Sequence, residues 1–495
     1  MSLINVTNLT FAYDGSYDNV FENVSFQIDT DWRLGFTGRN GRGKTTFLNL
    51  LMGKYEYQGS ISASVEFSYF PYEVADKSRM GIEILEQIAP DCEYWKIAKE
   101  LRALQLEDDI LYRPFETLSN GEQTKLMLAV LFSRENNFLL IDEPTNHLDI
   151  RGRELVSRYL NGKKGFILVS HDRAFLDGCV DHILSINKAN IEVQRGNFSS
   201  WYHNKQLQDN FELAENEKLK KEIRHLTESM REKAAWSDRA EARKIGIDPT
   251  KVDNKKGYRP LQGAKAKKTM ARSKAIETRQ QAAIEEKEGL LKNIEQTHDL
   301  KIFQTKYHLD RLVEVRDLAI DYGSGPVCEH ISFELRRGDR IALQGPNGCG
   351  KSSLLKLILG QDIPYTGQLW MGNGLKISYV PQDASDLSGS LTDYAIEHDL
   401  DESLFKAMLQ KLGFTREQFT KDIASFSAGQ KKKVLIAGSI IEPTHLHIWD
   451  EPMNYIDVIS RMQIEQLLLQ FQPTILFVDH DKVFCENIAT KTVIF

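Results

Sequence analysis

The stretch GRNGRGKTT at residues 38–46 returns almost unchanged as GPNGCGKSS at residues 345–353. Each copy follows a short apolar run, which predicts a buried strand, and precedes a pattern typical of a helix. Glycines in such a loop let backbone N–H groups turn inward around phosphate oxygens, and the helix N-terminus adds a favourable dipole. Because both copies fit G-x-x-x-x-G-K-[ST] in this context, the sequence predicts two phosphate-binding loops.

Further phrases repeat in the same order along the chain. LSNGEQ returns as FSAGQK, LIDEPTNHLD as IWDEPMNYID, and VSHDRAF as VDHDKVF. The offset between the copies rises only from 307 at the lysines of the phosphate loops to 309 at the histidines of the last phrase. The sequence therefore predicts a duplication, with two similar units at residues 1–205 and 301–495.

Each unit is expected to be α/β. Short apolar runs followed by a loop and a helical pattern predict strands at RLGFTG, FLLID and GFILVSHD in the first copy. The runs RIALQG, LHIWD and TILFVDHD occupy the matching places in the second copy.

Residues 206–300 differ in kind from both copies. Apolar residues recur at helical spacing over residues 219–234 and at every seventh position over residues 276–290, with charged residues in the gaps. This pattern predicts the two antiparallel helices of a coiled-coil hairpin. Glycine and proline residues between 246 and 264 predict the loop at its tip.

The net charge of −7 hides two regions of opposite sign. Residues 231–280 contain 15 Lys and Arg against 6 Asp and Glu, a net charge of +9, which leaves −16 for the rest of the chain. A basic hairpin on an acidic body is the charge layout of a protein that binds a phosphate backbone. A solvated coiled coil without a polyanionic partner is the alternative.

The sequence also favours one cellular compartment. No stretch approaches about 20 uninterrupted apolar residues, so no membrane-spanning helix is expected. The first residues lack the basic and apolar regions of a signal peptide. The five cysteines are scattered and never form a CxxC pair, which fits a reducing cytoplasm and excludes a disulfide framework. We therefore expect a cytoplasmic protein.

Acidic residues follow one apolar strand in each copy. Asp142 and Asp450 are expected to hold Mg²⁺, and Glu143 and Glu451 to orient or deprotonate the attacking water. An isolated Asp-Glu pair after a strand is more often part of a solvated loop, but here both pairs begin the same EP-x-N-x-x-D phrase. In each phosphate loop the lysine reaches the terminal phosphates, and the hydroxyl residue after it ligates Mg²⁺.

Tandem phosphate loops with these phrases resemble ATP-binding cassette (ABC) proteins over both copies. The resemblance implies two tandem ABC-type P-loop ATPase cassettes of the α/β class, joined by a long α-helical coiled-coil hairpin linker. It also implies two ATP molecules between the cassettes, each held by the phosphate loop of one and the serine-glycine signature of the other. On this basis residues 427–429 complete the Lys44 site, and residues 119–121 complete the Lys351 site.

The resemblance implies further residue roles. His171 and His480 match the switch histidine near the γ-phosphate, and Tyr13 and Tyr322 match the aromatic residue that stacks on adenine, with core packing as the alternative for both tyrosines. The candidate catalytic residues are Glu143, Glu451, His171 and His480. The candidate Mg²⁺ ligands are Thr45, Asp142, Ser352, Gln382 and Asp450. The candidate ATP-binding residues are Tyr13, Gly38, Asn40, Gly41, Gly43, Lys44, Thr45, Thr46, Ser119, Gly121, Tyr322, Gly345, Asn347, Gly348, Gly350, Lys351, Ser352, Ser353, Ser427 and Gly429.

The two copies depart from the family pattern in two places. The signatures read SNGE and SAGQ rather than SGGQ, which keeps the serine and the final glycine. The Q-loop glutamine is present as Gln382, but Tyr72 stands at the matching place in the first copy and has no amide oxygen for Mg²⁺. We therefore expect altered metal ligation or coupling at the Lys44 site.

Two cassettes, a charged linker at 206–300 and the phrase EPTNHLD together resemble the ABC-F family, and within it the antibiotic-resistance branch of Lsa-type proteins. The resemblance implies the ribosome as partner, through 23S rRNA, ribosomal proteins near the E site and the P-site tRNA, with no membrane and no stable protein oligomer required. The tip residues expected to contact RNA or tRNA are Lys251, Lys255, Lys256, Tyr258, Arg259, Lys265, Lys267 and Lys268. Tyr258 could instead be an incidental loop residue.

The resemblance implies an ATP-dependent protein that binds the bacterial ribosome and dislodges lincosamides, pleuromutilins or streptogramin A from the peptidyl-transferase centre. A housekeeping ABC-F translation factor is the first alternative. The ATPase subunit of a membrane transporter is less favoured, because such a subunit has no need of a long basic hairpin. A DNA-repair ATPase would carry zinc modules or a coiled coil that splits one cassette, and neither pattern is present in the sequence.

Overall fold

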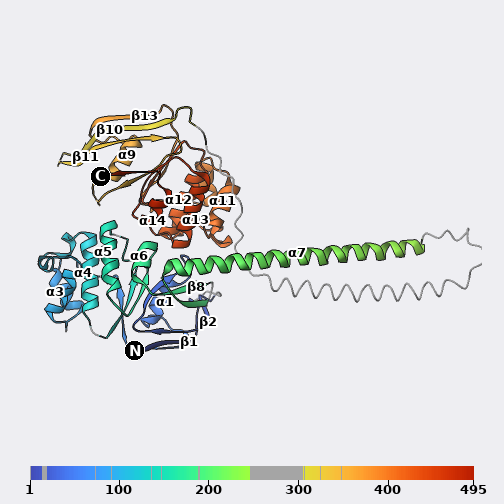
Figure 1. The fold of residues 1–495 in the computed structure, drawn as a ribbon, viewed down its shortest axis with the longest axis horizontal. Coiled ribbons are helices and arrows are strands. Elements are labelled where there is room, and N and C mark those ends of the chain that lie inside the picture. Colours follow the sequence, from blue (N-terminus) through green and yellow to red (C-terminus); the bar gives the residue numbers. More distant parts are fainter. Residues whose placement is uncertain are drawn as a thin grey trace, which may run out of the picture. The chain divides into compact units, whose positions relative to one another are not determined.

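The computed structural model describes residues 2–245 and 305–495, except positions 14–18, 73, 91, 135, 147, 188–189, 306, 324 and 347. The chain divides into two compact units, of which one combines Met1–Trp201 with His298–Phe495 and the other is Tyr202–Thr297. Both copies of the duplicated sequence therefore belong to one unit (Figure 1). The predicted tip loop and the second predicted linker helix lie outside the described residues.

The first copy is built around a six-stranded sheet with the order β5-β6-β7-β3-β8-β9. Its strands run parallel except for the antiparallel pair β8 and β9. The central strand β7 is buried at every position, as expected for a parallel sheet that is covered on both faces. The bounds are β3 Arg33–Thr37, β5 Glu66–Phe70, β6 Asn137–Asp142, β7 Phe166–Val169, β8 His182–Asn187 and β9 Asn190–Arg195.

A three-stranded antiparallel sheet with the order β2-β1-β4 packs with the central sheet of the first copy. Its strands are β1 Leu3–Phe11, β2 Phe21–Asp29 and β4 Gln58–Ser62, and helix α1, Lys44–Leu51, belongs to the same core. Ile4 of β1, Phe36 of β3 and Phe47 of α1 are fully buried in this core. The phosphate loop is thus mounted between a strand and a helix that are both fixed by apolar packing.

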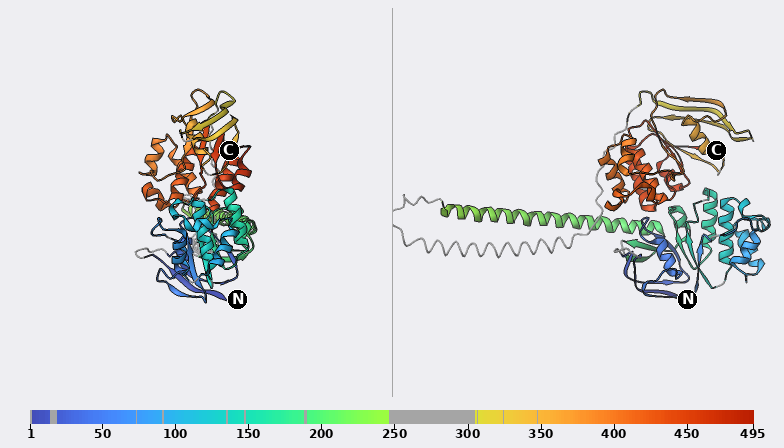
Figure 2. Two further views of the ribbon diagram at one scale, coloured as in Figure 1. Left: turned by 90° about the vertical axis from the view of Figure 1, so that its left-hand side faces the viewer. Right: turned by 180° about the vertical axis from the view of Figure 1, so that it is seen from behind.

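The remaining helices of the first copy gather at the end away from this antiparallel sheet (Figures 1 and 2). Three of them begin at side chains that cap their first turns: Ser119 accepts from the N–H of Glu122, Asp149 from that of Gly152, and Asp172 from that of Phe175. Such N-caps end the preceding loop at a fixed residue. The helices are α2 Gly81–Ile88, α3 Tyr94–Ala103, η1 Asp108–Tyr112, η2 Phe115–Thr117, α4 Asn120–Ser133, α5 Ile150–Asn161 and α6 Arg173–Cys179.

The second copy repeats this architecture. Its parallel sheet has the order β14-β15-β16-β12-β17, and its antiparallel sheet the order β11-β10-β13. The strands are β10 Arg311–Asp321, β11 Pro326–Arg336, β12 Arg340–Gln344, β13 Tyr365–Met371, β14 Ile377–Val380, β15 Leu446–Asp450, β16 Ile475–Val478 and β17 Lys491–Ile494. The helices are α9 Lys351–Ile358, α10 Leu391–Glu397, α11 Glu402–Lys411, η3 Arg416–Thr420, η4 Ile423–Ser425, α12 Ala428–Ile441, α13 Val458–Phe471 and α14 Lys482–Ile488.

The six strands predicted from apolar runs are all present, as β3, β6 and β7 in the first copy and β12, β15 and β16 in the second. Each run is buried along most of its length. The prediction of two α/β P-loop cassettes is therefore confirmed.

Helix α7, Phe198–Ile245, includes the first helix predicted for the linker but begins earlier than position 206. Phe198 and Trp201 in its first turn are only 1% and 4% exposed, and Asn197 caps the turn by accepting from the N–H of Ser200. The helix therefore starts as part of the first copy's packing. At 1.5 Å per residue its 48 residues are about 72 Å long, longer than a linker start at 206 implies.

Among the residues that the structure describes, no helix combines the length and the apolar character needed to cross a membrane.

Candidate functional site

The two phosphate loops have the same local geometry. Gly43 and Gly350 cap α1 and α9 in the left-handed conformation, with φ of 93° and 88°. A Cβ at Gly43 would lie 2.5 Å from Cγ1 of Val20, so only glycine fits there. Lys44 Nζ donates to the carbonyl of Gly38 at 2.7 Å, and burial lowers the Lys44 pKa. The lysine is thus folded back over its loop, where an anionic ligand would restore a counter-charge.

Lys351 repeats this arrangement in the second copy. Its Nζ donates to the carbonyls of Gly345 and Pro346 at 2.9 and 2.7 Å. The predicted ATP-binding residue Asn347 lies outside the described residues. In each loop the lysine therefore lies beside the N-terminus of the following helix, which is the arrangement that binds phosphate groups.

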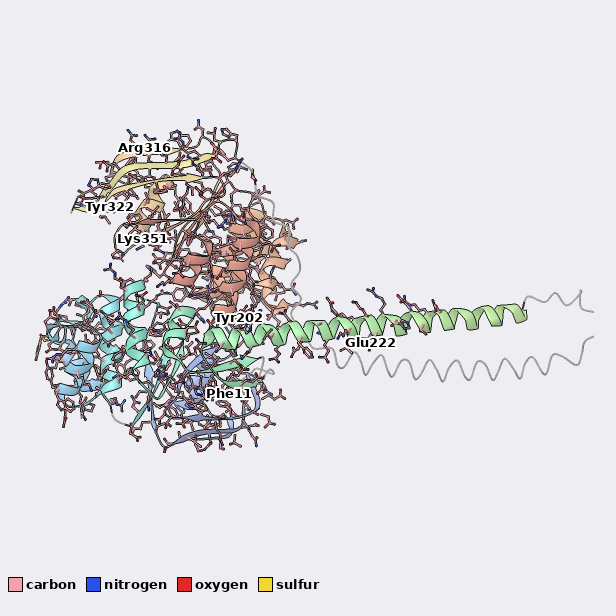
Figure 3. All side chains as sticks on the ribbon, viewed as in Figure 1. Phe11, Tyr202, Glu222, Arg316, Tyr322 and Lys351 are labelled. Atoms are coloured by element: carbon pink, nitrogen blue, oxygen red, sulfur yellow. The ribbon has the colours of Figure 1, made fainter. Side chains whose placement is uncertain are left out.

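The two predicted adenine-stacking tyrosines lie beside the phosphate loops. The hydroxyls of Tyr13 and Thr46 are 2.6 Å apart, and Tyr322 donates to Ser353 at 3.0 Å. Tyr13 is 45% exposed and Tyr322, which Figure 3 labels near Lys351, is 54% exposed. Both rings are therefore about half exposed, and the Tyr13 ring also contacts the buried Phe11, with 5.1 Å between the ring centroids.

The predicted metal-binding aspartates lie next to the hydroxyl residues of the loops. Thr45 and Tyr69 donate to Asp142 Oδ2 at 3.2 and 2.9 Å. Asp450 is 1% exposed, its Oδ1 accepts no hydrogen bond, and burial raises the pKa of this carboxyl group. A buried carboxylate oxygen without a donor fits a divalent cation at this position.

A metal at either site would depend on the nucleotide for much of its coordination. Within the described part of the chain, no group of three or more His, Cys, Asp or Glu side chains could hold an ion. Each site offers one aspartate and one hydroxyl, to which the Lys351 site adds the amide oxygen of Gln382, and so small a protein share is typical of Mg²⁺ bound with phosphate oxygens and water. These residues therefore fit a nucleotide-borne Mg²⁺ better than a permanent metal centre.

The two candidate catalytic glutamates share an uncommon backbone conformation. Glu143 and Glu451 have φ of 50° and 46°, in the left-handed region that non-glycine residues seldom adopt. Each faces the switch histidine of its own copy, since His171 Nε2 lies 3.3 Å from Glu143 Oε1 and His480 Nε2 lies 3.4 Å from Glu451 Oε1. Backbone strain held in place twice is typical of a functional site.

The surroundings of the two glutamates differ. Glu451 Oε2 accepts from Gln382 at 2.9 Å and from Asn454 at 2.6 Å. Burial acts to raise the Glu451 pKa, but the hydrogen bonds from His480, Gln382 and Asn454 hold it below its usual value. Glu143 Oε1 accepts no hydrogen bond, and burial, followed by the charge of Asp142, raises the Glu143 pKa to about 8.

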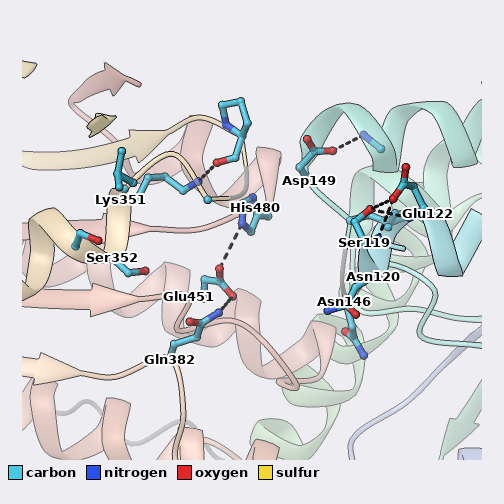
Figure 4. Close-up of a pocket in the computed structure, with 18 of the residues that line it drawn as sticks. Ser119, Asn120, Glu122, Asn146, Asp149, Lys351, Ser352, Gln382, Glu451 and His480 are labelled. Carbon is cyan, nitrogen blue, oxygen red and sulfur yellow. Dashed lines mark hydrogen bonds and ion pairs between the residues drawn. The ribbon is translucent and has the colours of Figure 1, made fainter. Parts of the chain in front are cut away.

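Residues of both copies line one large cavity, shown in Figure 4. Its volume is about 780 Å³, and it has Ser119, Asn120 and Gly121 on one side and Lys351 and Ser352 on the other. Gln382, Glu451 and His480 also line it. The structure therefore brings the first signature sequence together with the second phosphate loop, which is the pairing that the resemblance implies.

The second copy also contacts the first phosphate loop, through a backbone carbonyl that lies beside its signature. Asn40 Nδ2 donates to the carbonyl of Tyr455 at 2.8 Å, and a Cβ at Gly429 would lie 3.0 Å from the same nitrogen. A smaller cavity of about 310 Å³ is lined by Tyr13, Val20 and the loop itself, without Ser427. Gly429 is thus placed as expected, whereas Ser427 stays outside the lining of this cavity.

The sequence did not single out several polar residues that organise these sites. Lys432, which is 1% exposed, donates to the carbonyls of Pro381 at 2.6 Å and Glu451 at 3.2 Å. Tyr69 holds Asp142, and Arg153 reaches from the first copy to the carbonyl of His480. Tyr69 had a usable signal, because the same tyrosine recurs as Tyr379 three positions before the second Q-loop residue. The eight predicted RNA-contacting tip residues lie outside the described residues.

Comparison with known proteins gives a consistent family. Residues 21–146 and 328–454 match the ABC transporter family. The ribosome protection protein VmlR of Bacillus subtilis is 30% identical over 99% of this chain and 86% of its own length. The ATP-binding protein Uup of Buchnera aphidicola is 27% identical over 100% and 80%, and ABC transporter F family member 2 of Arabidopsis thaliana is 24% identical over 99% and 76%.

Solved structures support the same fold. An archaeal ribosome recycling factor, aABCE1, in complex with the ribosomal stalk protein aP1, has a TM-score of 0.62 at 19% identity, covering 98% of this chain and 87% of that chain. The structure titled RNase-L Inhibitor has a TM-score of 0.61 at 20% identity, covering 99% and 87%. At these identities the likeness supports the tandem-cassette fold and nothing finer.

Proposed function

Because the chain belongs to the ABC transporter family and carries two of its ATP-hydrolysing cassettes, we propose that it is a ribosome-protecting ATPase of the ABC-F type. ATP binding between the cassettes favours the ribosome-bound form, and hydrolysis permits release. The linker tip displaces lincosamides, pleuromutilins or streptogramin A from the peptidyl-transferase centre by shifting tRNA and ribosomal RNA. Within ABC-F the proposal places the chain in the Lsa-type resistance branch, acting in the cytoplasm.

The observation that carries the ATPase part is the cavity shared by the two copies. Lys351 and the N-terminus of α9 would hold the β- and γ-phosphates, and Ser119 at the N-terminus of α4 would meet the γ-phosphate from the other side. Tyr322 would stack on the adenine. A site assembled from both copies exists only when they meet, which links nucleotide binding to their association.

The chemistry follows from the residues around Glu451. Its carboxylate, held by Gln382 and Asn454, would orient the attacking water and accept its proton. His480, 3.4 Å from that carboxylate, would contact the γ-phosphate. Bound Mg²⁺ neutralises charge on the phosphates, and Asp450, Ser352 and Gln382 are the residues that would hold it.

The matching roles at the other site fall to Lys44, Thr45, Asp142, Glu143 and His171. Tyr72 replaces the Q-loop glutamine there and has no amide to bind Glu143 or the metal. Tyr69 donates a hydrogen bond to Asp142 at this site. We expect this site to bind ATP and to hydrolyse it more slowly than the Lys351 site.

The ribosomal part rests on relatives and on charge. VmlR, the 30% identical relative, is named a ribosome protection protein, and residues 231–280 carry a net charge of +9. Such a segment suits an RNA partner. The predicted contacts with 23S rRNA and P-site tRNA involve the tip residues from Lys251 to Lys268.

The ribosomal proposal is tested with a Glu143→Gln, Glu451→Gln double variant, which should bind ATP without hydrolysing it. We expect it to co-sediment with bacterial ribosomes in the presence of ATP and Mg²⁺, whereas the same carboxylate-to-amide change at the exposed Glu228 should not alter sedimentation. A double variant that binds ATP and stays in the supernatant would contradict a ribosomal partner.

Drug protection is tested separately by expressing the wild-type chain in a sensitive bacterium. Inhibitory concentrations for at least one of the three drug classes should rise several-fold, and Glu143→Gln, Glu451→Gln should abolish the rise. Ribosome binding with unchanged inhibitory concentrations for all three classes would instead support a housekeeping translation factor.

A further inference from the structure

Arg153 of α5 reaches across the boundary between the two copies. Its Nη1 donates to the backbone carbonyl of His480 at 3.2 Å and to Asp172 Oδ2 at 2.9 Å, while its Nε donates to the carbonyl of Leu148 at 3.0 Å. The Arg153 side chain is 10% exposed and that of Asp172 is 5% exposed. The guanidinium group is therefore buried and fixed by acceptors from three different loops.

Each acceptor belongs to a segment that carries a candidate site residue. Leu148 lies in the EPTNHLD phrase, whose Asn146 lines the large cavity. Asp172 follows His171 directly and caps α6. His480 is the candidate switch histidine of the second copy, and its side chain lies 3.4 Å from Glu451. We call the segments that follow β7 and β16 and carry His171 and His480 the switch loops. Arg153 thus binds the switch loops of both copies at once.

These contacts form a short path between the two glutamates. Glu143 faces His171 at 3.3 Å, His171 is bonded to Asp172 through the backbone, and Asp172 binds Arg153. Arg153 then binds the backbone of His480, whose ring faces Glu451. No step of this path requires a side chain that is mainly exposed, so solvent screening weakens none of its polar contacts strongly.

The second copy has a similar arginine, Arg461, which shares two of the three kinds of partner. Arg461 donates to the carbonyl of Ile456 at 2.9 Å and to Asp481 Oδ2 at 3.2 Å, matching two of the three bonds of Arg153. Its charge also reaches the first copy, where burial, followed by the charges of Lys44 and Arg461, holds the His171 pKa well below its usual value. The two arginines therefore both act across the boundary.

We propose that Arg153 is a positioning residue that couples the two ATP sites by joining the Asp172 side chain of one switch loop to the backbone of His480 in the other. This inference rests on the hydrolysis sites proposed above. Movement of the His171–Asp172 segment on ATP binding or product release would shift the His480 carbonyl through the guanidinium group. Lysine keeps the charge, but its three donors sit on one rotatable ammonium nitrogen and cannot reproduce the rigid planar fork with which Arg153 reaches acceptors from separate nitrogens.

The test compares Arg153→Lys with Arg158→Lys, a change of the same kind on the same helix. Arg158 is the matched control because it makes an exposed hydrogen bond to the carbonyl of Glu154 on its own helix. Steady-state hydrolysis is measured against ATP concentration, with and without Glu143→Gln. In the wild type and in the control we expect a Hill coefficient above 1, and Glu143→Gln should change turnover at the Glu451 site several-fold.

In Arg153→Lys the Hill coefficient should fall to about 1, and Glu143→Gln should change turnover at the Glu451 site by less than about twofold. Unchanged coupling in a folded Arg153→Lys protein would overturn the inference. If this variant does not fold, Asp172→Asn replaces it, because asparagine keeps the N-cap and removes the charged acceptor. A wild type that hydrolyses no ATP would instead refute the proposed function, so the two failures are distinguishable.

Discussion

Gln382 donates its side-chain amide to Glu451 Oε2 over 2.9 Å, and the first copy has Tyr72 in the place of this glutamine. A glutamine in this position fixes the carboxylate that would orient water, whereas a tyrosine has no amide and a larger ring. The carboxylate of Glu451 is therefore held in place by this glutamine, whereas that of Glu143 has no such partner from Tyr72. We therefore expect the Lys351 site to hydrolyse ATP faster than the Lys44 site.

Gln382→Tyr should lower turnover at the Lys351 site by about 10- to 100-fold, because a small displacement of a positioned base is costly. The measurement uses the Glu143→Gln background, in which only that site hydrolyses ATP. Tyr72→Gln in the Glu451→Gln background is the reciprocal change and should raise turnover at the Lys44 site. If neither Gln382→Tyr nor Tyr72→Gln changes turnover in its background, the residue at this position does not set the difference in rate between the two sites.

Asp457 and Asp149 cap equivalent helices but differ in burial. Asp457 is fully buried, with Lys433 Nζ at 2.7 Å and the hydroxyl of Ser460 at 2.9 Å. Asp149 accepts from the N–H of Gly152 at 2.7 Å and is partly exposed. Asp457→Asn should lower the free energy of unfolding by about 3–5 kcal/mol, because Lys433 would keep an uncompensated buried charge. Asp149→Asn should cost less than about 1 kcal/mol, since asparagine caps equally well.

The effect of Asp457 should depend on pH. Burial acts to raise its pKa, but the charge and hydrogen bond of Lys433 hold the Asp457 pKa far below its usual value. A depressed carboxyl pKa contributes stability that is fully present above the unfolded pKa of about 3.9 and is lost as the pH falls below it. The difference in unfolding free energy between wild type and Asp457→Asn should therefore be constant from pH 8 to 5 and shrink below about pH 4. Urea titrations across this range measure it.

How far the sequence predicts this protein depends on whether a feature is local. The phosphate loops and the strands that end at Asp142 and Asp450 follow from short patterns, because a strand, a tight turn and a helix start are determined by neighbouring residues. The duplication strengthened each pattern by showing it twice. The family pattern, rather than local spacing, predicted that Ser119 and Lys351 would line one cavity.

Contacts between distant residues could not be predicted in this way. Arg153 and His480 are 327 positions apart, and nothing in either neighbourhood indicates the other. Lys432 would be read as one of three surface lysines in KKK, yet it is buried because the carbonyls of Pro381 and Glu451 bind its ammonium group. The early start of α7 was missed for a related reason, since the burial of Phe198 depends on the first copy's packing.

Phe198 should anchor the start of α7 to the first copy. Its ring is 1% exposed and packs at 5.4 Å, between ring centroids, from Trp201. Phe198→Ala should lower the free energy of unfolding by about 3–5 kcal/mol, through lost burial and a residual cavity. Phe211→Ala on the same helix should change it by less than about 0.5 kcal/mol, because that ring is 69% exposed. Comparable losses in the two variants would contradict the anchoring role.

Among the residues that the structure describes, two ion pairs join the copies, and they should differ in strength. Arg173 and Glu465 lie 2.6 Å apart with side chains 9% and 10% exposed, whereas Lys482 and Glu154 lie 3.1 Å apart and are about half exposed. Glu465→Gln should destabilise the protein by about 3–5 kcal/mol, since Arg173 would remain buried without a carboxylate. Glu154→Gln should cost at most about 1 kcal/mol, because water and salt screen an exposed pair.

Glu465→Gln and Glu154→Gln also distinguish an effect on folding stability from an effect on the association of the two copies. If the Arg173–Glu465 pair holds the copies together, Glu465→Gln should also raise the ATP concentration needed for half-maximal hydrolysis, because the shared cavity must be reassembled at each turnover. Glu154→Gln should leave that concentration unchanged, because an ion pair between two half-exposed side chains contributes little to the association. A Glu465→Gln protein with lower stability but the wild-type ATP dependence would assign the pair to folding alone.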